Sequence, residues 1–259
     1  MSYSEDDLRR SVIAEFSHTK TLDHYASVVF DIGLWESERK IIEQYISQDS
    51  SILDIGCGTG RTTLALFRMG YDVLGIDITP AMIDRAQEIA RKQHAAVAYE
   101  VGDATRLRFS DESFDSAIFS FNGWCQIPTR AKRFDAMCEI YRTLKKGGQF
   151  IFTSHIRNRI DRHALTWTKE WLKHVVASRM GLFNQGDLEY GDIFFSRTNP
   201  GSTGSYARKQ FIHIPTLTEV TNLIHDAGFS VLLSEYRNSI APSDARLESG
   251  NCRFFVCQK

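Results

Sequence analysis

Two kinds of apolar pattern alternate along the middle of the chain. Short apolar runs, typical of strands buried on both faces, are separated by segments whose apolar side chains recur every three or four residues, as in helices. The strand-like runs lie at 51–55, 72–78, 97–101, 114–120 and 149–153. Strands and helices joined in this order by short links predict right-handed βαβ units, and therefore an α/β fold with a doubly wound, mainly parallel sheet.

Both ends of the chain add to this core. Residues 1–50 carry apolar side chains at helical spacing, which predicts a helical leader packed on the core. Two further strand patterns lie at 229–236 and 252–257, and the linker between them is too short for a crossover helix. These last two strands are therefore expected to pair as an antiparallel hairpin, which completes a seven-stranded sheet.

The alternation breaks between the fifth strand and residue 216. Residues 156–215 are too many for a single crossover, so we expect an inserted cap that covers part of the site. Its pattern predicts a helix over 160–178 and a hairpin with strands at 188–195 and 206–214, joined by a mobile loop. The core, 51–155 and 216–259, would then be one cofactor-binding unit.

Composition narrows the functional class. With 42% hydrophobic and 24% charged residues, the chain is an ordinary globular protein. A formal net charge of -1 gives no global field that would recruit nucleic acid or an anionic membrane, so neither partner is expected. The N-terminus is acidic and no apolar run could span a bilayer, which predicts a cytoplasmic protein. No feature of the sequence points to a particular oligomeric state.

The five cysteines predict neither a disulfide framework nor a metal site. They are odd in number, scattered, and never form a Cys-x-x-Cys pair. No metal ligands are therefore assigned.

Polar residues gather where the predicted strands end. Gly56, Gly58 and Gly60 follow the first strand, and the acids Asp77 and Asp103 follow the second and third. In the same way, Asn122 follows the fourth strand and His155 the fifth. Because a doubly wound sheet binds ligands beyond the carboxyl ends of its strands, these residues are expected to share one site.

Two cofactor classes compete for a glycine turn of this kind. The dinucleotide fingerprint needs a glycine three positions after Gly58, but Arg61 stands there. In addition, Asp54 would lie close to a bound pyrophosphate and repel it. A nicotinamide cofactor is therefore disfavoured.

The run from Ile52 to Gly60, Ile-Leu-Asp-Ile-Gly-Cys-Gly-Thr-Gly, resembles the first motif of the Rossmann-like, class I methyltransferases that depend on S-adenosyl-L-methionine. The resemblance covers about residues 45–155 and 216–259, and Lys145-Lys146-Gly147-Gly148 is similar to the family's turn before strand five, with Lys146 in place of a proline. It implies S-adenosyl-L-methionine as cofactor, S-adenosyl-L-homocysteine as product, and a sheet of order 3-2-1-4-5-7-6 with strand seven antiparallel.

The resemblance also implies roles for single residues. Asp77 would hold the two ribose hydroxyls, and Asp103 would accept the adenine amino group. Turn or capping roles are the rival explanation for these acids, and a turn with Gly123 is the rival for Asn122. The full predicted cofactor set, with Tyr25 as a cover from the leader, is Asp54, Gly56, Gly58, Gly60, Asp77, Ile78, Met82, Asp103, Ala104, Phe121, Asn122 and Tyr25.

The implied reaction is an in-line displacement of the methyl group from a sulfonium, for which alignment is the main requirement. His155 is the first candidate for a general base, followed by His213 and Tyr190, although a structural role is the alternative for each. The polar and aromatic cap favours a small organic acceptor that is methylated on oxygen, nitrogen or sulfur. A protein or RNA acceptor and a noncatalytic, cofactor-binding module remain alternatives.

Overall fold

The computed structural model describes residues 3–158, 164–172, 174, 186–196, 209–247 and 251–259. The predicted loop between the cap strands and much of the predicted cap helix lie outside these residues. No helix in the described part is both long enough and apolar enough to span a membrane.

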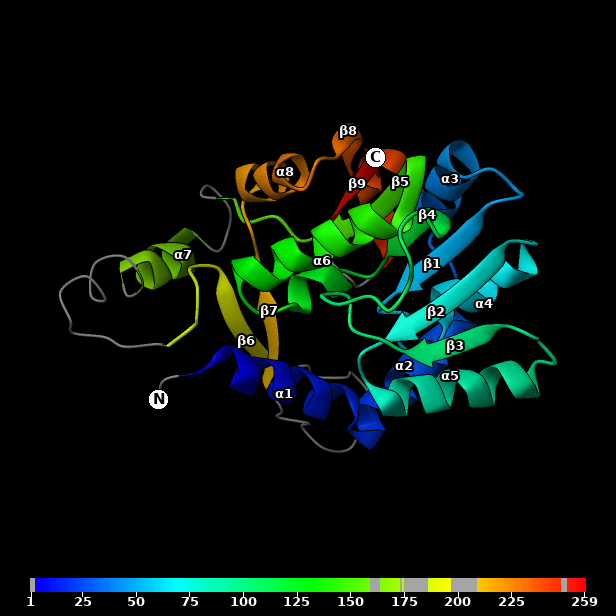
Figure 1. The fold of residues 1–259 in the computed structure, drawn as a ribbon. Helices are drawn as coiled ribbons and strands as arrows, with labels where there is room; N and C mark the ends of the chain where they lie inside the picture. The colour runs from blue at the N-terminus through cyan, green and yellow to red at the C-terminus, as the bar shows by residue number, and fades with distance from the viewer. Residues whose placement is uncertain (1–2, 159–163, 173, 175–185, 197–208, 248–250) are drawn as a thin grey trace.

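A seven-stranded sheet forms the centre of the molecule (Figure 1). Its strand order is β3-β2-β1-β4-β5-β9-β8, and only β9 runs antiparallel to its neighbours. This confirms the predicted sheet, with β8 and β9 as the expected closing hairpin. The strands are β1 (Ser51–Ile55), β2 (Asp72–Asp77), β3 (Ala98–Val101), β4 (Phe114–Phe119), β5 (Leu144–Ser154), β8 (Ser230–Tyr236) and β9 (Arg253–Gln258).

Helices cover both faces of this sheet. On one face, apolar side chains of α6 (Arg130–Thr143) and α8 (Leu217–Asp226) pack on β4 and β5. On the other face, α3 (Glu36–Tyr45) and α4 (Arg61–Arg68) pack on β1, β2 and β9. The remaining crossover helix, α5 (Pro80–Lys92), packs on β3. The strands between the two layers are buried on both sides, which explains their continuous apolar runs.

The leader consists of three helices with different neighbours. In α3, the N-terminal turn is fixed by Asp244, which accepts hydrogen bonds from the Ser37 amide at 3.0 Å and its hydroxyl at 2.6 Å. The second helix, α2 (Thr19–Asp31), packs through Val29 on α4 and α5. The first helix, α1 (Glu5–Phe16), lies away from the sheet beneath a separate hairpin (Figure 1).

That hairpin belongs to the predicted cap. Its strands, β6 (Asp192–Ser196) and β7 (Lys209–His213), pair antiparallel. The first begins later than the expected 188–195, and part of the expected 206–214 lies outside the described residues. Leu8 and Val12 of α1 pack against Phe211 of β7. A short helix, α7 (Ala164–Trp171), lies within the predicted cap helix. The first leader helix and the cap hairpin therefore form one packed unit.

A buried network of charges ties the hairpin to the core. His213 lies between two carboxylates, with Nδ1 2.6 Å from Asp192 and Nε2 2.9 Å from Glu219 of α8. The fully buried Arg133 of α6 donates to Glu189 at 2.6 Å. Glu189, Asp192 and His213 could form the ligand set of a metal ion by distance alone, but these hydrogen bonds already occupy them.

Candidate active site

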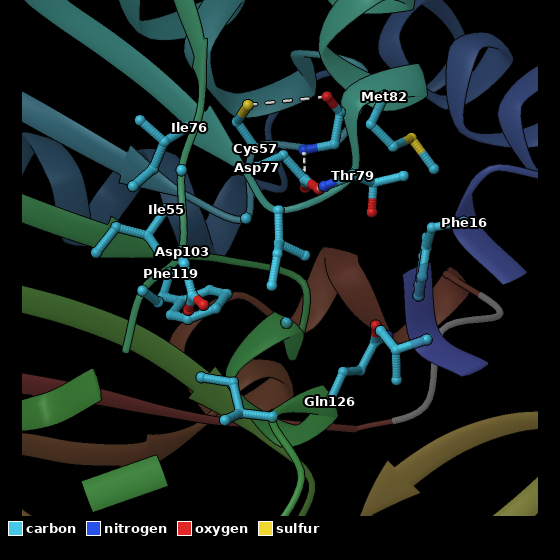
Figure 2. Close-up of a pocket in the computed structure, with 18 of the residues that line it drawn as sticks. Phe16, Ile55, Cys57, Ile76, Asp77, Thr79, Met82, Asp103, Phe119 and Gln126 are labelled. Carbon is cyan, nitrogen blue, oxygen red and sulfur yellow. Dashed lines mark hydrogen bonds between the residues drawn. The ribbon is translucent and has the colours of Figure 1, made fainter. Parts of the chain in front are cut away.

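A cavity of about 1180 Å³ lies beyond the carboxyl ends of β1 to β4. Its walls come from the loops after these four strands and from α1 and α2. Figure 2 shows side chains from these segments pointing into one shared space. Of the residues in 156–215 that the structure describes, none lines the cavity, so the hairpin reaches it only through α1.

The glycine loop after β1 forms one wall of the cavity. A Cβ on Gly56 would lie 2.5 Å from the Phe119 ring, and one on Gly60 would collide with the Tyr99 hydroxyl. At Gly58, which lines the cavity, the space around a Cβ is open. Gly56 and Gly60 are thus needed for close packing, whereas Gly58 leaves bare backbone for a ligand.

Asp77, the last residue of β2, joins this loop to the next one. Its Oδ2 accepts a hydrogen bond from the Gly58 amide at 3.0 Å, and its Oδ1 accepts one from the Thr79 amide at 2.8 Å. Burial raises the pKa of Asp77, and these two hydrogen bonds oppose that rise. Since a carboxylate has about four acceptor positions, Asp77 can accept two further hydrogen bonds from a ligand.

Asp103, just after β3, is the second acid in the cavity wall. Its Oδ1 accepts hydrogen bonds from the Thr105 amide at 2.9 Å and hydroxyl at 2.8 Å. Its Oδ2 accepts one from Arg9 of α1 at 2.6 Å. Near it, Ile78, Met82 and Ala104 give the cavity an apolar lining. An acid beside an apolar surface suits a flat ring that carries a polar edge.

Arg61 holds the wall formed by Phe121. The Arg61 guanidinium makes two hydrogen bonds of 2.6 Å to Glu38 of α3, and its carbon lies 4.9 Å from the centre of the Phe121 ring. Both members of the ion pair are almost fully buried. The Phe121 ring also contacts Tyr25, with ring centres 6.1 Å apart. The position of the Phe121 ring in the cavity wall therefore depends both on the leader helices and on Arg61, which follows the glycine loop.

Comparisons with known proteins agree with this geometry. Residues 52–148 match the family model described as a methyltransferase domain. A protein of Encephalitozoon cuniculi named as a methyltransferase is 33% identical over 76% of this chain and 79% of its own length. The chain belongs to the Rossmann-like, S-adenosylmethionine-dependent methyltransferases.

Further relatives cover most of this methyltransferase. A crystal structure of a S-adenosylmethionine-dependent methyltransferase from Methanosarcina mazei is 25% identical, covers 88% of this chain and 99% of its own, and has a TM-score of 0.65. The demethylmenaquinone methyltransferase of Lactiplantibacillus plantarum is 27% identical over 78% of this chain and 80% of its own length. A Burkholderia thailandensis N1-methyltransferase, solved with 1,6-didemethyltoxoflavin and S-adenosylhomocysteine, shares the fold at a TM-score of 0.65, with 13% identity and coverage of 100% and 92%.

The cavity lining fits the cofactor of this family, S-adenosyl-L-methionine. The spare acceptor positions on Asp77 and Asp103 suit the hydroxyls of a ribose and the amino group of an adenine. The apolar side chains near Asp103 suit the adenine ring, and the bare backbone at Gly58 leaves room for the rest of the cofactor. Most of the predicted cofactor residues line the cavity. They are Gly56, Gly58, Asp77, Ile78, Met82, Asp103, Ala104, Phe121 and Tyr25.

Three predicted cofactor residues of the methyltransferase lie outside the cavity lining. Asp54 is 1% exposed, accepts a hydrogen bond from the Thr63 hydroxyl at 2.6 Å, and has its pKa raised by burial to about 7. Asn122 is buried at the start of the 3₁₀ helix η1 (Gly123–Gln126), and its backbone N–H donates to the Thr153 hydroxyl at 2.8 Å. Gly60 packs on Tyr99. Direct cofactor contacts by these three remain predictions.

The three candidate bases also lie outside the cavity lining. Burial and the charge of Arg237 lower the pKa of His155, which is partly exposed but does not face this cavity. Both ring nitrogens of His213 are bound by carboxylates, and the Tyr190 hydroxyl donates to a backbone carbonyl of α7. The geometry therefore gives no support to a base at any of these positions.

Besides the segment 105–109 that follows Asp103, sequence reasoning missed two parts of the cavity wall. One is a face of α1 that contributes Glu5, Arg9, Val12, Ile13 and Phe16. The other is the segment after η1, where Gln126 and the two residues that follow line the cavity. The spacing of the α1 residues at 5, 9, 12, 13 and 16 is the available signal, since it places them along one helix face.

Proposed function

We propose that this methyltransferase moves the methyl group of S-adenosyl-L-methionine to an oxygen, nitrogen or sulfur of a small organic acceptor held in the same cavity. The observation that carries the proposal is the size and cover of the cavity. Its volume of about 1180 Å³ exceeds the roughly 300–1,000 Å³ typical of a pocket for one small ligand. Because α1 and α2 form part of its wall, it suits two small molecules better than a segment of polymer.

Two of the similar proteins act on or bind small molecules according to their names. The Lactiplantibacillus plantarum enzyme is named for demethylmenaquinone, and the Burkholderia thailandensis enzyme was solved with 1,6-didemethyltoxoflavin. These names support a small acceptor for the present chain without identifying it.

The side chains of the cavity would bind and orient the reactants. Asp77 would accept the ribose hydroxyls, and Asp103 would accept the adenine amino group beside Ile78 and Met82. The bound cofactor supplies a methyl group on a positively charged sulfur, which is electrophilic enough to need no metal. Alignment of two bound reactants can lower the barrier by about 7–11 kcal/mol. The leader helices would exclude water from the reacting pair.

An isotope experiment tests the acceptor class. Methyl-labelled S-adenosyl-L-methionine is given to a cell extract that has been separated by size, with either the wild-type protein or Asp77→Ala. We expect the wild-type protein to label the low-mass fraction and the variant to label neither fraction. Label in the macromolecular fraction would instead favour a protein or RNA acceptor. Tight cofactor binding with no label anywhere would favour a noncatalytic module.

A further inference from the structure

Gln126 occupies a distinct place in the cavity. It is the last residue of η1, and its partly buried side chain lines the cavity. Figure 2 shows it across the space from Asp77 and Thr79. Gln126 therefore belongs to the wall opposite the predicted ribose contact.

The side-chain amide of Gln126 has no hydrogen-bond partner among the residues that the structure describes. Two cationic side chains of the lining do have partners: Arg9 binds Asp103 at 2.6 Å, and Lys132 binds Asp135 at 3.0 Å. A primary amide offers two N–H donors and one carbonyl acceptor. Polar groups that a cavity wall leaves open are the ones that orient a ligand.

The backbone around Gln126 is held firmly. The backbone N–H of Asn122 donates to the Thr153 hydroxyl at 2.8 Å before η1, and the Arg133 guanidinium donates to the Ile127 carbonyl at 3.0 Å after it. Between them, the fully buried Trp124 packs on Phe152, with ring centres 5.5 Å apart. A side chain on such a fixed segment needs little ordering when it binds a ligand.

The lining that Gln126 shares also carries several apolar side chains. Val12, Ile13 and Phe16 come from α1, and Ile127 and Pro128 follow Gln126 directly. Glu5 is a lining carboxylate whose side chain makes no hydrogen bond within the described part of the chain, and it lies at the other end of α1 from Phe16. At 1.5 Å per residue that separation is about 16 Å.

We infer that Gln126 is an acceptor-binding residue, whose amide hydrogen-bonds a hydroxyl or carbonyl oxygen of an otherwise apolar, uncharged acceptor. This inference rests on the proposed function, since it assigns the second ligand of the same cavity. The apolar side chains around Gln126 hold the body of the acceptor, and the amide sets which way its polar edge faces. Acceptor binding and cofactor binding thus depend on different residues.

Two probes of equal shape test this assignment. They are 4-ethylphenol and 4-ethyltoluene, which differ by a hydroxyl in place of a methyl group. Their affinities are measured by ligand-observed NMR titration on the complex with S-adenosyl-L-homocysteine, for the wild-type protein, Gln126→Leu and the control Gln44→Leu. Gln44 is an exposed residue of α3, so its replacement makes the same chemical change away from the cavity.

We expect Gln126→Leu to bind 4-ethylphenol about 3- to 10-fold more weakly, as the loss of one hydrogen bond requires. Its affinities for 4-ethyltoluene and for S-adenosyl-L-homocysteine should fall by no more than twofold, and Gln44→Leu should match the wild-type protein throughout. Equal changes for the two probes, or no change for 4-ethylphenol, would overturn the inference. So would a wild-type complex that binds neither probe. Failure to bind S-adenosyl-L-homocysteine would instead overturn the proposed function itself.

Discussion

The guanidinium of Arg9 donates to the carboxylate of Asp103 at 2.6 Å, across 94 positions of sequence. The contact joins the first leader helix to the acid that ends the third strand. Both side chains are partly exposed, at 46% and 25%, so the ion pair itself contributes about 0–1 kcal/mol to stability. The ion pair matters because it holds α1 next to Asp103, the predicted partner of the adenine amino group.

Replacement of the two partners separates their roles. Asp103→Ala should weaken S-adenosyl-L-homocysteine binding about 10-fold or more, because a hydrogen bond to a charged acceptor contributes about 1.5–3 kcal/mol. Arg9→Ala removes a partly exposed partner and should change the affinity by less than about threefold. Isothermal titration calorimetry measures both. Equal losses in the two variants would show that closure by α1, rather than the Asp103 carboxylate, controls cofactor binding.

The glycines of the loop should respond differently to alanine. Gly56→Ala places a methyl group against Phe119, and we expect the free energy of unfolding to fall by about 2–4 kcal/mol, from overpacking and backbone strain together. Gly58→Ala meets open space, so its backbone strain should cost only about 1–2 kcal/mol. Its methyl group enters the cavity, however, and should weaken cofactor binding more than stability. Urea unfolding and cofactor titration test the contrast, and equal stability losses would contradict it.

The ends of the parallel strands and a cover by Tyr25 were predictable from sequence, whereas the part of the cavity wall formed by α1 was not. Asp77 and Asp103 each follow a clear strand pattern, and parallel strands bring their carboxyl ends together. The contact between Arg9 and Asp103 depends on how α1 packs against β7, and no local pattern specifies that distant contact. The cap, residues 156–215, was expected to cover the cavity. Among the described residues, the cover comes instead from the leader helices α1 and α2.

Asp54 shows what a motif leaves open, since its contact with the cofactor remains a prediction. Its position before the glycine loop suggested a cofactor contact, but its side chain is buried and bonded to Thr63. Neighbouring Ile55 lines the cavity instead, as expected where successive strand side chains face opposite sides. A motif gives the order of the residues, but the side of the strand on which each side chain lies decides which of them reach the ligand.

Asp54 should also give the protein a measurable pH dependence. Burial raises its pKa from 3.8 to about 7, so between these values the folded state keeps a proton that the unfolded state has released. The free energy of unfolding should therefore fall as pH rises through this window, by at most about 1.4 kcal/mol per pH unit. Asp54→Asn cannot titrate and should lack this component. Urea unfolding at pH 5 and 7 tests it, and identical pH profiles for the two proteins would refute the assignment.

The buried pair of Arg61 and Glu38 gives a further test of the link between leader and glycine loop. Arg61→Met leaves Glu38 as an uncompensated buried charge, so the free energy of unfolding should fall by about 3–5 kcal/mol. The double variant Arg61→Met, Glu38→Gln removes that charge and should recover part of the loss. Denaturant titration of the wild-type protein, the single variants Arg61→Met and Glu38→Gln, and the double variant forms a double-mutant cycle. Purely additive losses would mean that the two side chains are not coupled.

We expect the cavity beyond β1 to β4 to bind S-adenosyl-L-methionine through Asp77. The most direct test is calorimetric titration of S-adenosyl-L-homocysteine into the wild-type protein, Asp77→Asn and Asp77→Ala. We predict saturable binding to the wild-type protein and a loss of about 100-fold or more in Asp77→Ala, as two hydrogen bonds to a carboxylate require. Asp77→Asn should be intermediate. Equal affinity in all three proteins, or binding of NADH in preference to S-adenosyl-L-homocysteine, would contradict the account.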